Sequence, residues 1–318
     1  MRRVLLTGAS GFVGRHVWSP LSADNGVRCL TRNAAKARRK LPGRDWVEGD
    51  ISDGASLDRA MEGCDSALYL VHEMGDAGAG FRERELASAK TFADAAARAG
   101  LRRIVYLGGV APRGQGSEHL QSRLEVGEAL RAGSVPAVEL RASMIIGHGS
   151  LSWLIVRDLA ARLPVMVLPR WLGSKTQPVA IDDVVVALLR ALDLPGDGSQ
   201  SFDIPGPATL TGGEILDETA AALGLDKPRT LSIPLLTPEL SAHWVHFVTR
   251  ARWSVAKELV VGLTEDLVAR DDRFWSLIDH PELVGFREAA ARAIAAEKRD
   301  GDVPGVWGFV ERQVAERS

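Results

Sequence analysis

Three glycines, Gly8, Gly11 and Gly14, stand three residues apart near the start of the chain. They follow the apolar run 3–7, which is a predicted strand, and they precede a predicted helix. A phosphate can approach backbone N–H groups at a helix N-terminus only where no Cβ holds it off. We therefore expect Gly8 to form a tight turn, Gly11 to admit phosphates and Gly14 to let the helix pack closely. The spacing predicts a dinucleotide diphosphate site made by Thr7, Gly8, Ser10, Gly11, Phe12, Val13 and Gly14. The alternative is a glycine-rich connection that binds no ligand.

The end of the second predicted strand bears on which dinucleotide binds. Sites that prefer NAD usually place a carboxylate there, which accepts hydrogen bonds from the ribose 2′-hydroxyl. Here the strand 27–30 is followed by Arg32 and Asn33, and more basic residues follow at 36–40. The planar guanidinium of Arg32 can bind a 2′-phosphate. We predict contacts from Arg32 and Asn33 and a preference for NADP(H), with NAD(H) possible. The alternative is that these bases form a solvated helix face.

Further candidate contacts lie at the carboxyl ends of the later strands, where ligands bind in open parallel sheets. Asp50 is placed to accept a hydrogen bond from the adenine amino group. Arg141 is a candidate for holding an acidic group, or it pairs with Glu139. The predicted cofactor contacts at these strand ends are Asp50, Ile51, Leu70, Val71, His72, Leu107, Gly108 and Arg141.

Two alternating sequence periods predict the architecture that positions these residues. Short apolar runs such as 67–71, 103–107 and 137–141 read as strands buried on both faces. Helical repeats separate them, most clearly at 81–99. We predict a Rossmann-type α/β fold, a doubly wound parallel sheet, with a smaller, mostly helical C-terminal lobe. The nucleotide-binding domain is expected to comprise 1–150 and a returning segment at 179–206, and the lobe 151–178 and 207–318.

Composition excludes several other classes of protein. The chain has 318 residues with 39 basic and 41 acidic side chains, a balance unlike the basic stripe of a nucleic-acid-binding domain. Cys29 and Cys64 lack CxxC spacing and companion histidines, so we predict neither a disulfide framework nor a metal site. The sequence contains no signal-peptide apolar region and no membrane-spanning run, so we expect a cytoplasmic protein without a transmembrane segment.

Several motifs together resemble a known superfamily. They lie at 7–14, 49–50, 70–75, 106–109, 140–142, 181–184 and 202–207. They are similar to those of the atypical short-chain dehydrogenases/reductases. Within that superfamily the chain most resembles NmrA-like NAD(P)-binding proteins, which are related to the accessory nucleotide-binding subunit of respiratory complex I. The resemblance spans almost the whole chain. It implies a Rossmann domain with NAD(P) across its edge and a C-terminal lobe that binds whatever else the protein recognises.

The chain departs from the superfamily at the catalytic positions. Active members use a tyrosine, a lysine four residues later, and a serine at the end of the fifth strand. The only tyrosines are Tyr69 and Tyr106, which are followed four residues later by glutamate and valine. The serine position falls at Gly108 or Gly109. The usual proton-relay pair is therefore absent from this chain.

Two other side chains occupy the places of the missing pair. His119 and Arg123 are four residues apart, hence on one helical face. A histidine can act as general acid or base, and an arginine can hold a ribose or an oxyanion. The alternative is a helix-surface pair that merely contacts the cofactor or nothing. His72 is a second catalytic candidate, or it is a positioning residue in a loop at the cofactor's edge.

These observations lead to two expectations about function. The first is an NADPH-dependent reductase of a small hydrophobic carbonyl or enone compound, with quinone-like compounds among the candidate substrates. The second is a non-catalytic dinucleotide-binding redox sensor or assembly factor that acts through a protein partner. The aromatic residues between 243 and 253 are candidates for a hydrophobic substrate pocket, although core packing explains them equally well. No nucleic-acid partner is expected.

Overall fold

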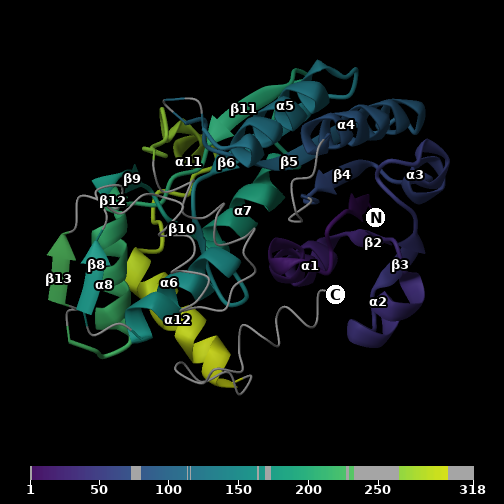
Figure 1. The fold of residues 1–318 in the computed structure, drawn as a ribbon. Coiled ribbons are helices and arrows are strands. Elements are labelled where there is room, and N and C mark those ends of the chain that lie inside the picture. Colours follow the sequence, from purple (N-terminus) through teal and green to yellow (C-terminus); the bar gives the residue numbers. More distant parts are fainter. Residues whose placement is uncertain are drawn as a thin grey trace.

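Seven parallel strands form the central sheet of the computed structural model, in the order β11-β6-β5-β4-β1-β2-β3 (Figure 1). The structure describes residues 2–72, 80–112, 114, 116–162, 165–168, 173–226, 229–232 and 265–299. The strands of this sheet are β1 (Arg3–Leu6), β2 (Gly26–Thr31), β3 (Asp45–Glu48), β4 (Ser66–Tyr69), β5 (Arg103–Gly109), β6 (Ala137–Ala142) and β11 (Gln200–Asp203). The predicted doubly wound α/β fold is confirmed.

The strand order reverses between β1 and β4, the position at which doubly wound sheets have their ligand-binding crevice. From β1 the chain builds β2 and β3 on one side, then crosses back to build β4, β5 and β6 on the other. The loops that follow β1 and β4 therefore diverge, and ligands of doubly wound sheets bind at this switch point.

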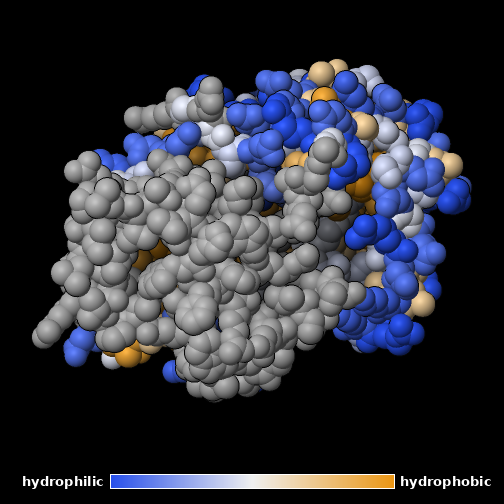
Figure 2. Space-filling model, viewed as in Figure 1, coloured by the Kyte–Doolittle hydropathy of each residue, from blue (hydrophilic) through white to orange (hydrophobic). Residues whose placement is uncertain are grey.

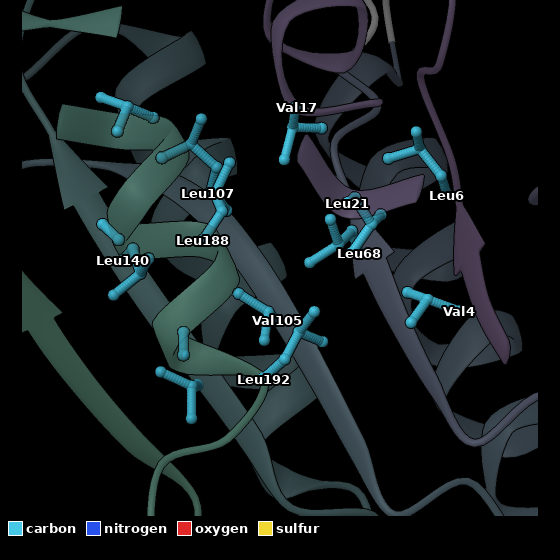
Figure 3. Packing of buried hydrophobic residues seen from close by; sticks show 14 of the residues in the cluster. Val4, Leu6, Val17, Leu21, Leu68, Val105, Leu107, Leu140, Leu188 and Leu192 are labelled. Carbon is cyan, nitrogen blue, oxygen red and sulfur yellow. The ribbon is translucent and has the colours of Figure 1, made fainter. Parts of the chain in front are cut away.

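Helices cover both faces of the sheet. On one face lie α1 (Phe12–Asp24), α2 (Ala34–Lys40) and α7 (Ile181–Ala191), and on the other lie α3 (Gly54–Met61), α4 (Phe81–Arg98) and α5 (Glu118–Ala132). Figure 3 shows Val17 and Leu21 of α1 and Leu188 of α7 packed toward Leu68 and Val105 of the sheet. The burial of these side chains stabilises the packing of α1 and α7 against the sheet.

A second cluster of buried residues lies beyond the sheet, in the part of the chain after residue 143. Its helices are α6 (Leu151–Arg162), α8 (Gly212–Ala222) and α12 (Phe286–Arg299), with the short α11 (Arg273–Leu277) nearer the sheet. Short strands complete this part: β7 (Ile145–Ile146), β8 (Val165–Leu168), β9 (Lys175–Thr176), β10 (Val179–Ala180), β12 (Leu210–Thr211) and β13 (Arg229–Ser232). The aromatic segment 243–253 lies outside the described residues.

A buried ion cluster holds α12 against α6. Glu297 accepts hydrogen bonds from Trp153 Nε1 and Arg157 Nη1, each at 2.8 Å, and Arg157 also pairs with Asp158. All four side chains are almost completely buried. Because every charge in the cluster faces an opposite charge, the lobe can bury these groups without leaving an arginine unneutralised.

The chain passes from this lobe back to the sheet. α7 packs on the sheet and β11 forms its outer strand beside β6. The division into domains at 150, 179 and 206 stays a prediction. Within the described residues, no helix combines the length and apolar character that a bilayer crossing requires.

Candidate functional site

Packing explains two glycines of the turn between β1 and α1. Gly8 has a φ of +65°, and a Cβ there would lie 2.4 Å from the carbonyl oxygen of Leu70. A Cβ on Gly14 would lie 2.2 Å from the carbonyl oxygen of Gly8. Any side chain at either position would displace backbone, so the close approach of α1 to the turn depends on both.

Gly11 differs from the other two glycines. It is exposed and has an extended backbone, with φ −75° and ψ 177°, that any residue can adopt. A Cβ there would meet only the Gly8 carbonyl oxygen, at 3.2 Å. Internal packing therefore gives little reason for a glycine here. The absence of a side chain at Gly11 instead leaves the N-terminus of α1 uncovered.

The N-terminus of α1 has neither a side-chain cap nor an acidic residue in its first turn. By contrast α3, α5 and α8 are capped by the side chains of Asp53, Ser117 and Thr211. The first amides of a helix have no intrahelical acceptor and form its positive end. An uncapped, acid-free N-terminus beside an exposed glycine fits the diphosphate of a dinucleotide.

Thr7 ties together the two strands that border the crevice. Its buried hydroxyl donates to the carbonyl oxygen of Leu68 at 3.2 Å and accepts from the backbone N–H of Leu70 at 2.9 Å. The side chain thus links the end of β1 to the end of β4. Leu70 and Val71 follow β4 and are half-buried beside it.

At the outer end of the crevice, Arg32 and Asn33 behave differently. Arg32 is exposed, whereas the Asn33 side chain caps α2 by accepting from the N–H of Lys36 at 2.8 Å. A carboxylate also lies here, because Glu48 Oε2 accepts from the N–H of Ala34 at 2.9 Å. The α2 N-terminus is therefore occupied by protein groups. Arg32 and Asn33 are both exposed, but the Asn33 side-chain oxygen is already used as the helix cap.

The surface around α2 is strongly basic. Lys36, Arg38, Arg39 and Lys40 are all exposed. Figure 2 shows hydrophilic residues gathered in the region where Figure 1 places α2. This positive surface lies beside the end of the crevice where the adenosine half of a dinucleotide is expected, and it favours an anionic ligand.

Asp50 is held as a carboxylate at the end of β3. Its Oδ1 accepts hydrogen bonds from the Ser52 backbone N–H at 2.9 Å and hydroxyl at 2.7 Å. The bond from the Ser52 backbone lowers the pKa of Asp50, and the charge of Arg32 lowers it further. The neighbouring Ile51 packs against the core beneath the sheet. Asp50 therefore presents a fixed negative acceptor near Arg32.

The structure brings all three catalytic candidates together at the end of β5. His72 Nε2 lies 2.9 Å from the carbonyl oxygen of Leu107, so this nitrogen carries the proton. The ring of His119 packs on that of Phe81, with centroids 4.6 Å apart. Arg123 lies against the end of β5, because a Cβ on Gly109 would be 3.8 Å from its Nη1, and its charge lowers the pKa of both imidazoles.

Both histidines are held in the neutral form. Burial lowers the pKa of His72 to about 3, and Arg123 lowers it further despite the opposing bond to Leu107. Burial also lowers the pKa of His119, and Arg123 adds to the effect. Arg123 is therefore the permanent charge of this group.

The two glycines at the end of β5 both lie near α5. A Cβ on Gly109 would lie 3.2 Å from Leu120 Cδ2 and 3.5 Å from Arg123 Cδ. A Cβ on Gly108 would lie 3.0 Å from Tyr106 and 3.1 Å from Glu139 Oε1, two side chains that themselves contact α5. The assignment of the superfamily's serine position to Gly108 or Gly109 stays a prediction.

Arg141 pairs with Glu139. Its Nη2 donates to Glu139 Oε2 at 2.9 Å, and Arg131 Nε donates to the same oxygen at 2.9 Å. Glu139 is almost completely buried. Of the two alternatives for Arg141, the ion pair is the one present in the structure.

Neither tyrosine is placed for proton transfer. Tyr69 and Tyr106 are both completely buried, and burial raises the pKa of each. The hydroxyl of Tyr106 donates to the backbone carbonyl oxygen of Arg123 at 3.0 Å. Both rings therefore belong to the core beneath the site, and Tyr106 supports α5 at Arg123.

The loop before α5 is also held from the second lobe. The backbone N–H of Gly116 donates to the Glu265 carboxylate, whose oxygens lie at 3.1 and 3.2 Å. Sequence reasoning missed Glu265, because 149 residues separate it from the loop that it contacts. This bond links the lobe to the helix that carries His119 and Arg123.

Comparison with known proteins agrees with this geometry. A family model described as NAD(P)H-binding matches residues 8–160. Among curated relatives, (4-alkanoyl-5-oxo-2,5-dihydrofuran-3-yl)methyl phosphate reductase of Streptomyces griseus subsp. griseus is 27% identical over 301 residues, which cover 88% of this chain and 98% of the relative. Ceramide reductase of Caulobacter vibrioides is 29% identical over 243 residues, which cover 73% of each chain.

Solved structures share the fold. The triphenylmethane reductase of Citrobacter sp., solved in complex with NADP(H), superimposes with a TM-score of 0.70 at 19% identity and covers 92% of this chain and 99% of its own. Residues 8–160, which the family model matches, include the three glycines of the turn and helix α5. They form an NAD(P)H-binding domain, and the chain is similar to reductases over most of its length.

Proposed function

We propose that the chain is an NADPH-dependent reductase that delivers a hydride to a small, hydrophobic, conjugated carbonyl compound, an enone. The observation that supports it most is the position of Arg123, a permanent cation beside two neutral imidazoles at the end of β5. The reductase relative from Streptomyces griseus, aligned along almost its whole length, supports the reaction class.

The site is suited to stabilise negative charge on oxygen. When bound, the dinucleotide supplies a hydride from its nicotinamide. As the hydride reaches the β-carbon of an enone, the electron pair of the double bond moves toward the carbonyl oxygen, which becomes an enolate. Arg123 can hold that oxygen through its fork of N–H donors, and a fixed charge in a partly buried site is effective at this task.

The source of the proton favours an enone over a simple ketone. Neutral His72 and His119 are poor acids, and the arginine does not release its proton. An alkoxide formed from a simple ketone needs an acid at once. An enolate spreads its charge over oxygen and carbon, so it can persist until water protonates its α-carbon and the saturated ketone leaves.

The missing tyrosine–lysine pair keeps one competing function open. A redox sensor would bind dinucleotide through the same turn and pass its state to a protein partner, without hydride transfer. The buried tyrosines and the glycines in the serine position agree with that alternative. Turnover with any member of an enone panel distinguishes the two.

The preference for NADPH rests on Arg32, opposed by Glu48. Arg32 is exposed at the end of β2, and Glu48 places a carboxylate on the neighbouring N–H of Ala34. A 2′-phosphate between them would be attracted by one and repelled by the other. Arg32 is the stronger influence, because its planar fork can bond to phosphate directly.

Separate substitutions of Arg32 and Glu48 should change the preference for NADPH over NADH in opposite directions. Arg32→Ala is expected to weaken NADPH binding about tenfold or more and leave NADH nearly unchanged, since only the 2′-phosphate contact is lost. Glu48→Gln should strengthen NADPH a few-fold relative to NADH, because it removes a nearby negative charge. Dissociation constants from fluorescence titration check both. An unchanged ratio in Arg32→Ala would refute the assignment.

Removing the charge of Arg123 should slow catalysis without abolishing cofactor binding. We expect Arg123→Ala to lower kcat for enone reduction by roughly 100-fold, the typical effect of losing one oxyanion donor. His119→Ala should have a smaller effect, since the neutral ring supplies no proton. The rate of NADPH oxidation with quinones, enones and aldehydes measures both effects. Arg59→Ala, which removes an exposed arginine on α3, is the control. Equal turnover in Arg123→Ala and the wild type would contradict the mechanism.

The neutral state of His72 predicts a pH dependence of stability. Its pKa is about 3 in the folded chain against an ordinary 6.5, so unfolding takes up a proton below pH 6.5. The stability that His72 contributes is complete above pH 6.5 and is lost as the pH falls toward 3, by about 2–3 kcal/mol near pH 4.5.

Urea unfolding of the wild type and His72→Gln between about pH 7 and pH 4.5 checks this. The variant should lose less stability over that interval, and the His72 ring resonances of the wild type should not titrate within it. Titration of His72 near pH 6.5 would contradict the prediction.

A further inference from the structure

Arg44 connects three segments behind the glycine turn. Its Nη1 donates to the carbonyl oxygen of Ala9 at 2.8 Å. Its guanidinium carbon lies 4.5 Å from the ring centroid of Trp18 on α1. Arg44 itself stands immediately before β3. One half-buried side chain therefore joins the turn, the helix that begins after it and a neighbouring strand.

A second arginine holds the next peptide of the turn. Arg15 Nε donates to the carbonyl oxygen of Ser10 at 2.9 Å. Both carbonyl groups between Gly8 and Gly11 are thus bound by guanidinium groups. The turn is closed by the backbone N–H of Gly11, which donates to the carbonyl oxygen of Gly8 at 2.9 Å.

The two guanidinium groups lie near each other without a carboxylate between them. Burial lowers the pKa of Arg44, and the charge of Arg15 lowers it further. Asp45, the nearest acid in sequence, pairs with Arg28 at 3.6 Å. In the part of the chain that the structure describes, neither Arg15 nor Arg44 forms an ion pair with a carboxylate. Arg44 is half-buried and Arg15 is exposed. A bound anion nearby would offset the repulsion between the two positive charges.

The bond to Ala9 also sets the direction of an amide. A trans peptide is planar, and its C=O and N–H point in opposite directions. Because Arg44 binds the Ala9 carbonyl oxygen, the N–H of Ser10 in the same peptide faces away from Arg44.

We propose that Arg44 is a positioning residue for the cofactor diphosphate, which holds the Ala9–Ser10 peptide so that its N–H faces the bound anion. The inference rests on the proposed function, because it takes the turn to hold the diphosphate of NADPH. The diphosphate is shared by NADPH and NADH, so Arg44 acts on both cofactors equally. We assign the discrimination between them to Arg32 and Glu48.

The test compares Arg44→Ala and Arg44→Lys with the control Arg273→Ala. Arg273 on α11 also donates to a backbone carbonyl, that of Ser201 at 3.3 Å, and lies over an aromatic ring, that of Phe202, at 5.0 Å. Dissociation constants for NADPH and NADH are measured by fluorescence titration, and melting temperatures without ligand report on folding. Lysine keeps the charge but lacks the planar group that bonds to Ala9 while stacking on Trp18.

We expect Arg44→Ala to weaken NADPH and NADH by the same factor, about tenfold, as expected for a lost charge-assisted hydrogen bond. Arg44→Lys should recover little of this loss, and Arg273→Ala should leave both constants unchanged. If Arg44→Ala does not fold, Arg44→Lys replaces it in the test, and its affinities for NADPH and NADH should fall by the same factor.

Three results would overturn the inference. The first is a loss confined to NADPH, which would place Arg44 on the 2′-phosphate. The second is unchanged binding of both cofactors in the two Arg44 variants. The third is an equal loss in Arg273→Ala. Failure of the wild type to bind either nucleotide would refute the proposed function itself, and with it this inference.

Discussion

The positive N-terminus of α1 is the feature on which the rest of the site depends. Gly8 and Gly14 bring the helix against the turn, and Gly11 leaves its first amides uncovered. No side chain caps these amides, so an anion is their natural acceptor. The strand order places them at the switch point between β1 and β4, where Thr7 links the two strands. Diphosphate binding is thus a consequence of backbone geometry that the sheet holds in place.

The other end of the crevice is specialised in a different way. The chain's two tyrosines are core residues, and the superfamily's proton-relay pair is absent, whereas α5 carries an arginine near two neutral imidazoles. Such a group can stabilise negative charge on oxygen but does not deliver a proton. This chemistry suits acceptors that delocalise the electron pair of the incoming hydride. The bond from Gly116 to Glu265 links the loop before α5 to the second lobe.

Local patterns in the sequence predicted the fold and the glycine turn, because strand and helix periods and glycine spacing are short-range properties. Long-range contacts were not predictable in the same way. Arg44 reaches Ala9 across 35 residues, and Glu48 reaches Ala34 only because β3 lies beside β2. The low pKa of His72 follows from burial, which no spacing reveals.

The most direct test of this account replaces Gly11 with aspartate. Aspartate is a preferred helix cap, and the extended backbone of Gly11 accepts it, so the folded chain should keep or raise its melting temperature. The new carboxylate would occupy the first amides of α1 and repel a diphosphate. Titration calorimetry should then detect no binding of NADPH or NADH at concentrations that saturate the wild type. Wild-type affinity for NADPH in a folded Gly11→Asp chain would contradict the account.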